Sequence, residues 1–145
     1  MWSHPHVLQR PTPEAWSAGE HLHHAEMVNR GALGAIRRVQ AGRGDSASVG
    51  DAALAFLETG DMGGPRKAPE QVHPPTDLTP ATADDLRQSN RSRFVDLDLE
   101  EVRSLEETVP HPLLGPLRPR HWVRFALLHT QHHHRLAASA LDAAG

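Results

Sequence analysis

The clearest pattern of apolar and polar positions lies between about residues 119 and 140. At about 100° per residue, small and apolar side chains recur there on one face of a helix. The members of this face are Trp122, Phe125, Ala126, His129, His133, Leu136, Ala137 and Ala140. Two histidines therefore occupy its middle, where leucine or isoleucine would be usual. By the same angles, His132 lies on the flank of this face and His134 points away from it.

A second helix is predicted from Ser17 to about Gln40. Ser17 and Glu20 match the capping box, in which the hydroxyl accepts from the third backbone N–H of the helix and the carboxylate reaches back to the cap. The sequence Gly42-Arg-Gly44 favours the end of this helix. The capping box also fixes the rotational phase of the helix, and therefore which residues face inward.

The centre of the inner face of this second helix is His24. Its neighbours, within about 60° of it around the helix axis, are Glu20, Met27, Val28, Gly31 and Ala35. We expect His21 at the edge of this face and His23 to point sideways into solvent. Gly31 and Ala35 are one turn apart, and we expect them to let another helix approach closely.

The segment 41–80 carries much of the glycine and proline of the chain. Residues 49–57 are predicted to form a short helix within it, with Ser48 or Asp51 near its start. Residues 60–80 read as a long surface loop, and loops of this length are usually functional or disordered.

The region 82–108 is predicted to be helical, with an N-cap at Thr82. Its weak centre allows either one long helix or two, the second beginning near Asp98. Prolines in 111–120 exclude a helix and predict a turn. We interpret His111 as a structural residue that orders this turn.

Composition narrows the class of protein. The chain has 145 residues, which we interpret as one domain spanning 1–145, and its few aromatic residues favour an all-α helical bundle. A net charge of -3 gives no reason to expect nucleic-acid binding. No apolar run is long enough for a transmembrane helix, and the N-terminus lacks the features of a signal peptide. We therefore expect a soluble cytoplasmic protein.

Histidine is the outlier in composition, with 12 residues, whereas cysteine is absent. Disulfides, thiolate metal sites and a cysteine nucleophile are excluded. We hypothesise a site of three histidines, His24, His129 and His133, which would leave an open position on a divalent metal for water or substrate. The alternative is that these histidines are merely buried and hydrogen-bonded, with Glu20 or Asp96 as acceptor for His24.

Two further residues have alternative interpretations. Glu20 is either only the cap partner of Ser17 or also the acceptor that orients His24. His132 is either solvated at the rim of the site or a candidate general base. Trp16 and Trp122 are interpreted as core anchors.

Three pieces of sequence together resemble the DinB/YfiT-like superfamily. They are Trp16-Ser-x-x-Glu-x-x-x-His24, then His111-Pro-x-x-Gly115-x-Leu117, then Trp122 followed by His129-x-x-His-His133. The resemblance covers residues 14–141. It implies a DinB-like up-and-down helical bundle that binds a metal through His24, His129 and His133.

The resemblance also implies chemistry. Characterised relatives are metal-dependent S-transferases that use a low-molecular-weight thiol such as bacillithiol or mycothiol, and a thiol-dependent isomerase, while others are named hydrolases. We therefore expect a divalent metal, with Zn or Ni favoured, a small-molecule substrate and a thiol nucleophile. The alternatives are a metal-dependent hydrolase and a non-catalytic metal-binding bundle in stress response.

The family's first helix should precede Trp16. Only 15 residues do so here, and 3 of them are prolines. We expect this helix to be short or missing, or the true start to lie upstream, or a partner subunit to fill its groove. Since an unfilled groove would expose apolar surface, a homodimer is expected.

Overall fold

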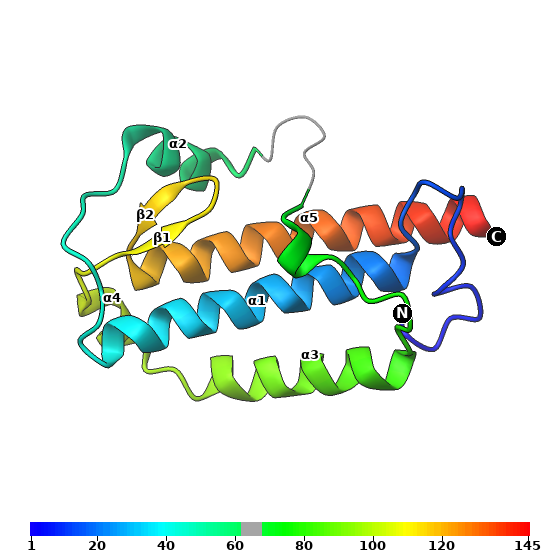
Figure 1. Ribbon diagram of the computed structural model, residues 1–145, viewed down its shortest axis with the longest axis horizontal. Coiled ribbons are helices and arrows are strands. Elements are labelled where there is room, and N and C mark those ends of the chain that lie inside the picture. Colours follow the sequence, from blue (N-terminus) through cyan, green and yellow to red (C-terminus); the bar gives the residue numbers. More distant parts are fainter. Residues whose placement is uncertain (62–67) are drawn as a thin grey trace.

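A computed structural model of the chain describes residues 1–61 and 68–145, and it is mainly helical (Figure 1). The elements in chain order are α1 (Ala18–Gln40), α2 (Asp51–Thr59), a 3-10 turn η1 (Glu70–Val72), α3 (Pro80–Val95), α4 (Leu99–Ser104), β1 (Val109–His111), β2 (Gly115–Leu117) and α5 (Pro119–Ala144). The all-α fold class is confirmed, with a two-stranded hairpin added.

Three long helices build the bundle, with α1 lying between α5 and α3 (Figure 1). Helices α1 and α3 run in the same direction and α5 runs opposite to both. The connection from 41 to 79 therefore carries the chain back along the length of the bundle. Residues 1–17 form turns and contain no helix, so no helix precedes α1 in the described chain.

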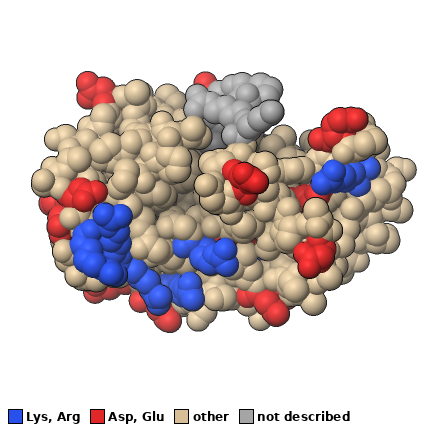
Figure 2. All heavy atoms as spheres, in the orientation of Figure 1, with Lys and Arg blue, Asp and Glu red and all other residues tan. Residues whose placement is uncertain are grey.

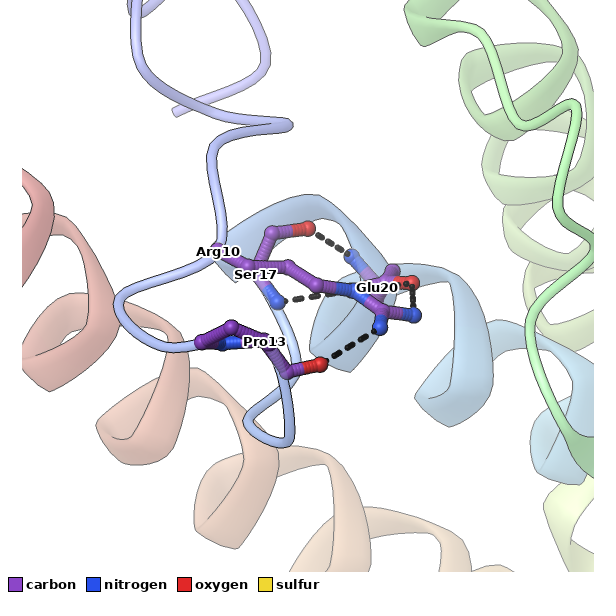
Figure 3. A network of polar contacts seen from close by, with 4 residues as sticks. All are labelled: Arg10, Pro13, Ser17 and Glu20. Carbon is purple, nitrogen blue, oxygen red and sulfur yellow. Dashed lines mark hydrogen bonds and ion pairs between the residues drawn. The ribbon is translucent and has the colours of Figure 1, made fainter.

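The start of α1 is held by the predicted capping box (Figure 3). The Ser17 hydroxyl accepts from the Glu20 N–H at 3.1 Å, and the Glu20 carboxylate accepts from the Ser17 N–H at 2.8 Å. The guanidinium of Arg10 also donates to this carboxylate, at 2.6 Å, and to the carbonyl of Pro13 at 3.0 Å. The N-terminal segment is thereby attached to the first turn of α1.

The core is divided into two apolar clusters along the α1–α5 contact. The large apolar cluster is at the hairpin end and contains Ala32, Ala35, Ile36, Val39, Ala53, Leu57, Val102, Val109, Leu117, Trp122, Phe125 and Ala126. The small apolar cluster is at the end where α5 finishes and contains Val7, Ala18, Leu22, Ala137 and Ala140, with Trp2 packed against it. The face predicted for the last helix therefore does form the interface with α1.

Two inward assignments are wrong. Gly31 is exposed, and a Cβ placed on it would meet no described atom within 4 Å, because the buried face of α1 is centred on Ala32 and Ile36 instead. Leu136 is 37% exposed, because Ala137 and Ala140 form the contact at that end of α5.

In the middle of the chain, Asp51 is the first residue of α2, as predicted. Helix α3 is preceded by Thr79 rather than Thr82. The alternative of two helices in this region is confirmed, since Asp98 caps α4 by accepting from two backbone N–H groups. Part of the long loop, 62–67, lies outside the described residues.

The proline-rich segment before α5 forms a turn, as predicted, and this turn joins the two short strands β1 and β2. Val109 pairs with Leu117 and His111 with Gly115, while Pro110 faces Pro116. The strands are short enough for prolines to be accommodated. His111 orders the turn as predicted, since its Nδ1 accepts from the N–H groups of Leu113 and Leu114 at 3.1 and 3.2 Å.

Charged side chains of both signs are spread over the face seen in Figure 2. Positive side chains gather over the end of α1, whose last turn carries Arg37 and Arg38. Cations there oppose the negative end of the helix dipole. None of the helices in the described chain is both long and apolar enough to cross a membrane.

Candidate metal centre

The three histidines singled out in the sequence meet between the two apolar clusters. His24 comes from α1, and His129 and His133 come from successive turns of α5. All three are buried, and one ring nitrogen from each lies within 4.8 Å of the others, so the group could hold a metal ion. We call these three residues the histidine layer.

His24 is oriented by the backbone of the long connection. Its Nδ1 lies 2.7 Å from the carbonyl oxygen of Val72, at the end of η1. A carbonyl only accepts, so Nδ1 carries the proton and donates it, and Nε2 is left with a free lone pair. This is the arrangement that a metal-binding imidazole requires.

The Nε2 atoms of His24 and His129 face each other at 3.2 Å. Two nitrogens bound tetrahedrally at about 2.0–2.1 Å from one ion would lie roughly 3.3 Å apart. In the metal-free chain one of the two must donate, and that one is His129, because His24 Nε2 holds the lone pair. The Nδ1 of His129 is then a buried acceptor without a partner among the described residues.

The third member, His133, has an imidazole as its partner. Its Nδ1 lies 3.0 Å from the Nδ1 of His21, one turn before His24 on α1. The ring centroids of His133 and His24 are 4.5 Å apart, and those of His133 and His129 are also 4.5 Å apart.

Burial keeps the histidine layer uncharged at neutral pH. Desolvation, together with the smaller effect of the neighbouring imidazoles, lowers the pKa of His129 to about 3 and that of His133 to about 2. The pKa of His24 is also lowered by burial, against the hydrogen bond to Val72, which raises it. Neutral imidazoles are the form that binds metal ions. The donor set and the 3.2 Å separation of the two Nε2 atoms therefore fit a divalent cation.

Neighbouring residues take several of the predicted roles and change others. His134 is exposed and His132 is half-buried, as the helical angles predict, and the ring of His132 lies 5.2 Å from that of His133. Glu20 serves the cap and Arg10, so it is not the acceptor for His24, and neither is Asp96.

The prediction that His23 is solvated is wrong, since it is 8% exposed. His23 precedes Glu26 by three residues and so lies on the same side of α1. That side is covered by α3, where Asn90 donates to the carbonyl and the carboxylate of Glu26. Helix α1 is thus covered on two sides, by α5 and by α3. A prediction based on one buried face therefore placed His23 in solvent.

An indole lies over the histidines on the side of the N-terminal segment and η1. The ring of Trp16 is 5.1 Å from that of His24, 5.4 Å from His21 and 6.0 Å from His73. Trp16 is only half-buried, so it borders the site rather than anchoring the core. Trp122, in contrast, is buried in the large apolar cluster as expected.

Two contributors to the site were missed in the sequence. The acceptor for His24 is a backbone carbonyl, and no side-chain pattern could reveal it. His21 was placed only at the edge of its helical face, although its spacing of three residues from His24 puts both side chains on neighbouring turns.

The comparison with known proteins agrees with the site and the fold. A family model described as the DinB superfamily matches residues 5–137, which include the histidine layer. No curated protein and no solved structure matches the chain. The match covers most of the sequence and agrees with the helical bundle and its three buried histidines. The chain belongs to the DinB superfamily.

Proposed function

We propose that the protein binds a divalent metal ion through His24, His129 and His133 and acts as a metal-dependent transferase with a low-molecular-weight thiol as nucleophile. The observation that carries the proposal is the buried group of three imidazoles whose ligand atoms lie within 4.8 Å of one another. The resemblance to thiol-dependent relatives supports the reaction class, and Zn or Ni suits such a donor set.

A bound divalent cation would lower the pKa of a thiol at its open position, so that the thiol reacts as a thiolate. The three histidines contribute no charge, because burial keeps them neutral. The positive charge of the ion would therefore remain uncompensated, and this favours an anionic fourth ligand such as a thiolate. The thiol must come from a small molecule, because the chain has no cysteine.

A metal-dependent hydrolase is the second candidate, and the position of His132 supports it. This half-buried imidazole packs against His133 and could accept a proton from water at the rim. The donor group found among the described residues contains no carboxylate, and Glu20 is engaged by Ser17 and Arg10. Since the donor group in the described part of the chain is made of imidazoles alone, we favour thiol transfer over hydrolysis.

Metal content tests the binding step. Tag-free protein should contain about one metal ion per chain by elemental analysis, with an anomalous scan to identify the element. The His129→Ala variant should lose the metal, whereas His134→Ala, the matched control on the exposed side of α5, should retain it. Absence of metal from the unmodified chain after loading with Zn or Ni would overturn the proposal.

Thiol transfer tests the catalytic step. With a soluble thiol and an alkyl halide, a carbon–sulfur bond forms, the carbon–halogen bond breaks, and the thiol proton passes to the buffer. Loaded protein should accelerate thiol consumption, and His24→Ala should not. If loaded protein binds metal but hydrolyses an ester instead, the second candidate stands. If neither reaction is observed, the protein is a non-catalytic metal-binding bundle.

The homodimer and the cytoplasmic location stay predictions.

A further inference from the structure

Each member of the histidine layer has a different environment at its Nδ1. His24 has the Val72 carbonyl at 2.7 Å, and His133 has the Nδ1 of His21 at 3.0 Å. His129 has no partner at this atom among the residues that the structure describes. The partner of His24 is a backbone carbonyl, whereas the partner of His133 is the side chain of His21. The contact of His133 can therefore be altered by substitution of His21.

The contact restricts which nitrogen of His133 is free for a metal. Two neutral imidazole nitrogens 3.0 Å apart share one proton, so one donates and the other accepts. If His133 donates from Nδ1, its Nε2 keeps a lone pair. If His133 accepts at Nδ1, its Nε2 carries the proton and must lose it before it can bind an ion, as the Nε2 of His129 must. Only the first arrangement leaves a free lone pair at the Nε2 of His133 in the metal-free chain.

Ring contacts with His133 and Trp16 hold His21 beside the histidine layer. Its ring is half-buried, lies 5.3 Å from that of His133 and packs edge-on against Trp16 at 5.4 Å. Trp16 also contacts His24. The same indole therefore borders His24, which is a proposed metal ligand, and His21, the hydrogen-bond partner of His133. The residue before His21, Glu20, is fixed by the capping box. His21 therefore lies in a helical turn whose start is fixed.

We propose that His21 is a positioning residue, which accepts the Nδ1 proton of His133 and so keeps His133 in the tautomer whose Nε2 can bind a metal ion. The proposal rests on the metal site proposed above for its consequence, but not for the hydrogen bond itself. Such outer hydrogen bonds to metal-binding histidines typically change metal affinity by roughly 10–100-fold.

The test uses three variants of the full chain. In His21→Leu the acceptor is removed. In His21→Gln an amide oxygen can accept the same proton. His134→Leu is the matched control, because it replaces an exposed histidine one residue from His133. Thermal unfolding and far-UV circular dichroism check that each variant folds.

The first readout is the tautomer of His133 in metal-free protein, from long-range ¹H–¹⁵N spectra of the imidazoles. We expect the Nδ1–H form in the unmodified chain, in His21→Gln and in His134→Leu, and a mixture or the Nε2–H form in His21→Leu. An unchanged tautomer in His21→Leu, or an Nε2–H form in the unmodified chain, would overturn the inference.

The second readout is the affinity for Zn, measured by competition with a chelator. We expect His21→Leu to bind roughly 10–100-fold more weakly, His21→Gln to recover most of the loss and His134→Leu to match the unmodified chain. Equal affinity of His21→Leu and the unmodified chain would overturn the inference while leaving the proposed function intact. If the unmodified chain binds no metal, the proposed function fails, and the tautomer readout alone decides on the role of His21.

Discussion

The histidine layer and the large apolar cluster lie side by side along the same pair of helices, yet they are built in opposite ways. The cluster around Ile36 and Phe125 removes apolar surface from water, which stabilises the fold. The histidine layer buries polar rings, and one nitrogen of His129 has no partner in the described part of the chain. Burial of an unpaired polar group costs free energy. The large apolar cluster therefore stabilises the bundle. The histidine layer lowers the stability, and its burial is possible because the apolar clusters offset that cost.

The largest expected effect is that of acid on the histidine layer. In an unfolded chain the pKa of histidine is 6.5, whereas in the folded chain the pKa of His129 is about 3 and that of His133 about 2. The unfolded state therefore binds more protons between these values, and the free energy of unfolding falls as the pH drops below 6.5. At about pH 5 the loss should be on the order of 2 kcal/mol for each of these two imidazoles.

Urea denaturation of metal-free protein at about pH 7 and about pH 5 measures this effect. His133→Leu should lose the part of the pH dependence that this imidazole contributes, on the order of 2 kcal/mol between about pH 7 and about pH 5, since leucine does not titrate. Ile36→Ala, in the apolar cluster, should keep all of it. Identical pH dependence in His133→Leu and the unmodified chain would remove the contrast between the two regions.

A truncation in the large apolar cluster gives the next effect. Ile36 is fully buried, so Ile36→Ala should lower the free energy of unfolding by about 2–5 kcal/mol. Leu127→Ala on the exposed side of α5 should change it by no more than about 0.5 kcal/mol. Under the proposed metal site, neither variant should alter the number of ions bound per chain. A loss of metal in Ile36→Ala that still folds would show that the two regions are not separable.

The smallest expected effect concerns the outer face of α1. Gly31 is in the interior of the helix, and a methyl group added there would have no described atom within 4 Å. Gly31→Ala should raise the free energy of unfolding by about 0.5–1 kcal/mol, with Zn affinity unchanged. Destabilisation measured by urea denaturation would mean that another helix approaches this position after all.

Local signals in the sequence predict the two ligand-bearing helices well. Ser17 and Glu20 fix the start and phase of α1, and Pro119 marks the first turn of α5. With both phases known, the inward direction of His24, His129 and His133 follows from helix geometry. These parts depend only on contacts within about four residues, which a sequence pattern can reveal.

Other parts depend on contacts between distant segments. The burial of His23 requires that α3 cover a second side of α1, and the chain between them gives no sign of this packing. The Val72 carbonyl reaches His24 across 48 residues through an irregular connection. The hairpin of β1 and β2 is stabilised against α1 and α5 in spite of its prolines. Such features follow from tertiary packing and not from local propensity.

The separation of the histidines along the chain has a consequence for the order of folding. His24 and His129 are 105 residues apart in sequence, and His21 and His133 are 112 apart. Contacts that close such long loops carry a large entropic cost and tend to form late. A chain that has made α1 but not yet docked α5 keeps His24 apart from His129 and His133. During biosynthesis, the capacity to capture an ion would therefore appear only once the bundle is assembled, and metal uptake would report that the whole chain has reached its native topology.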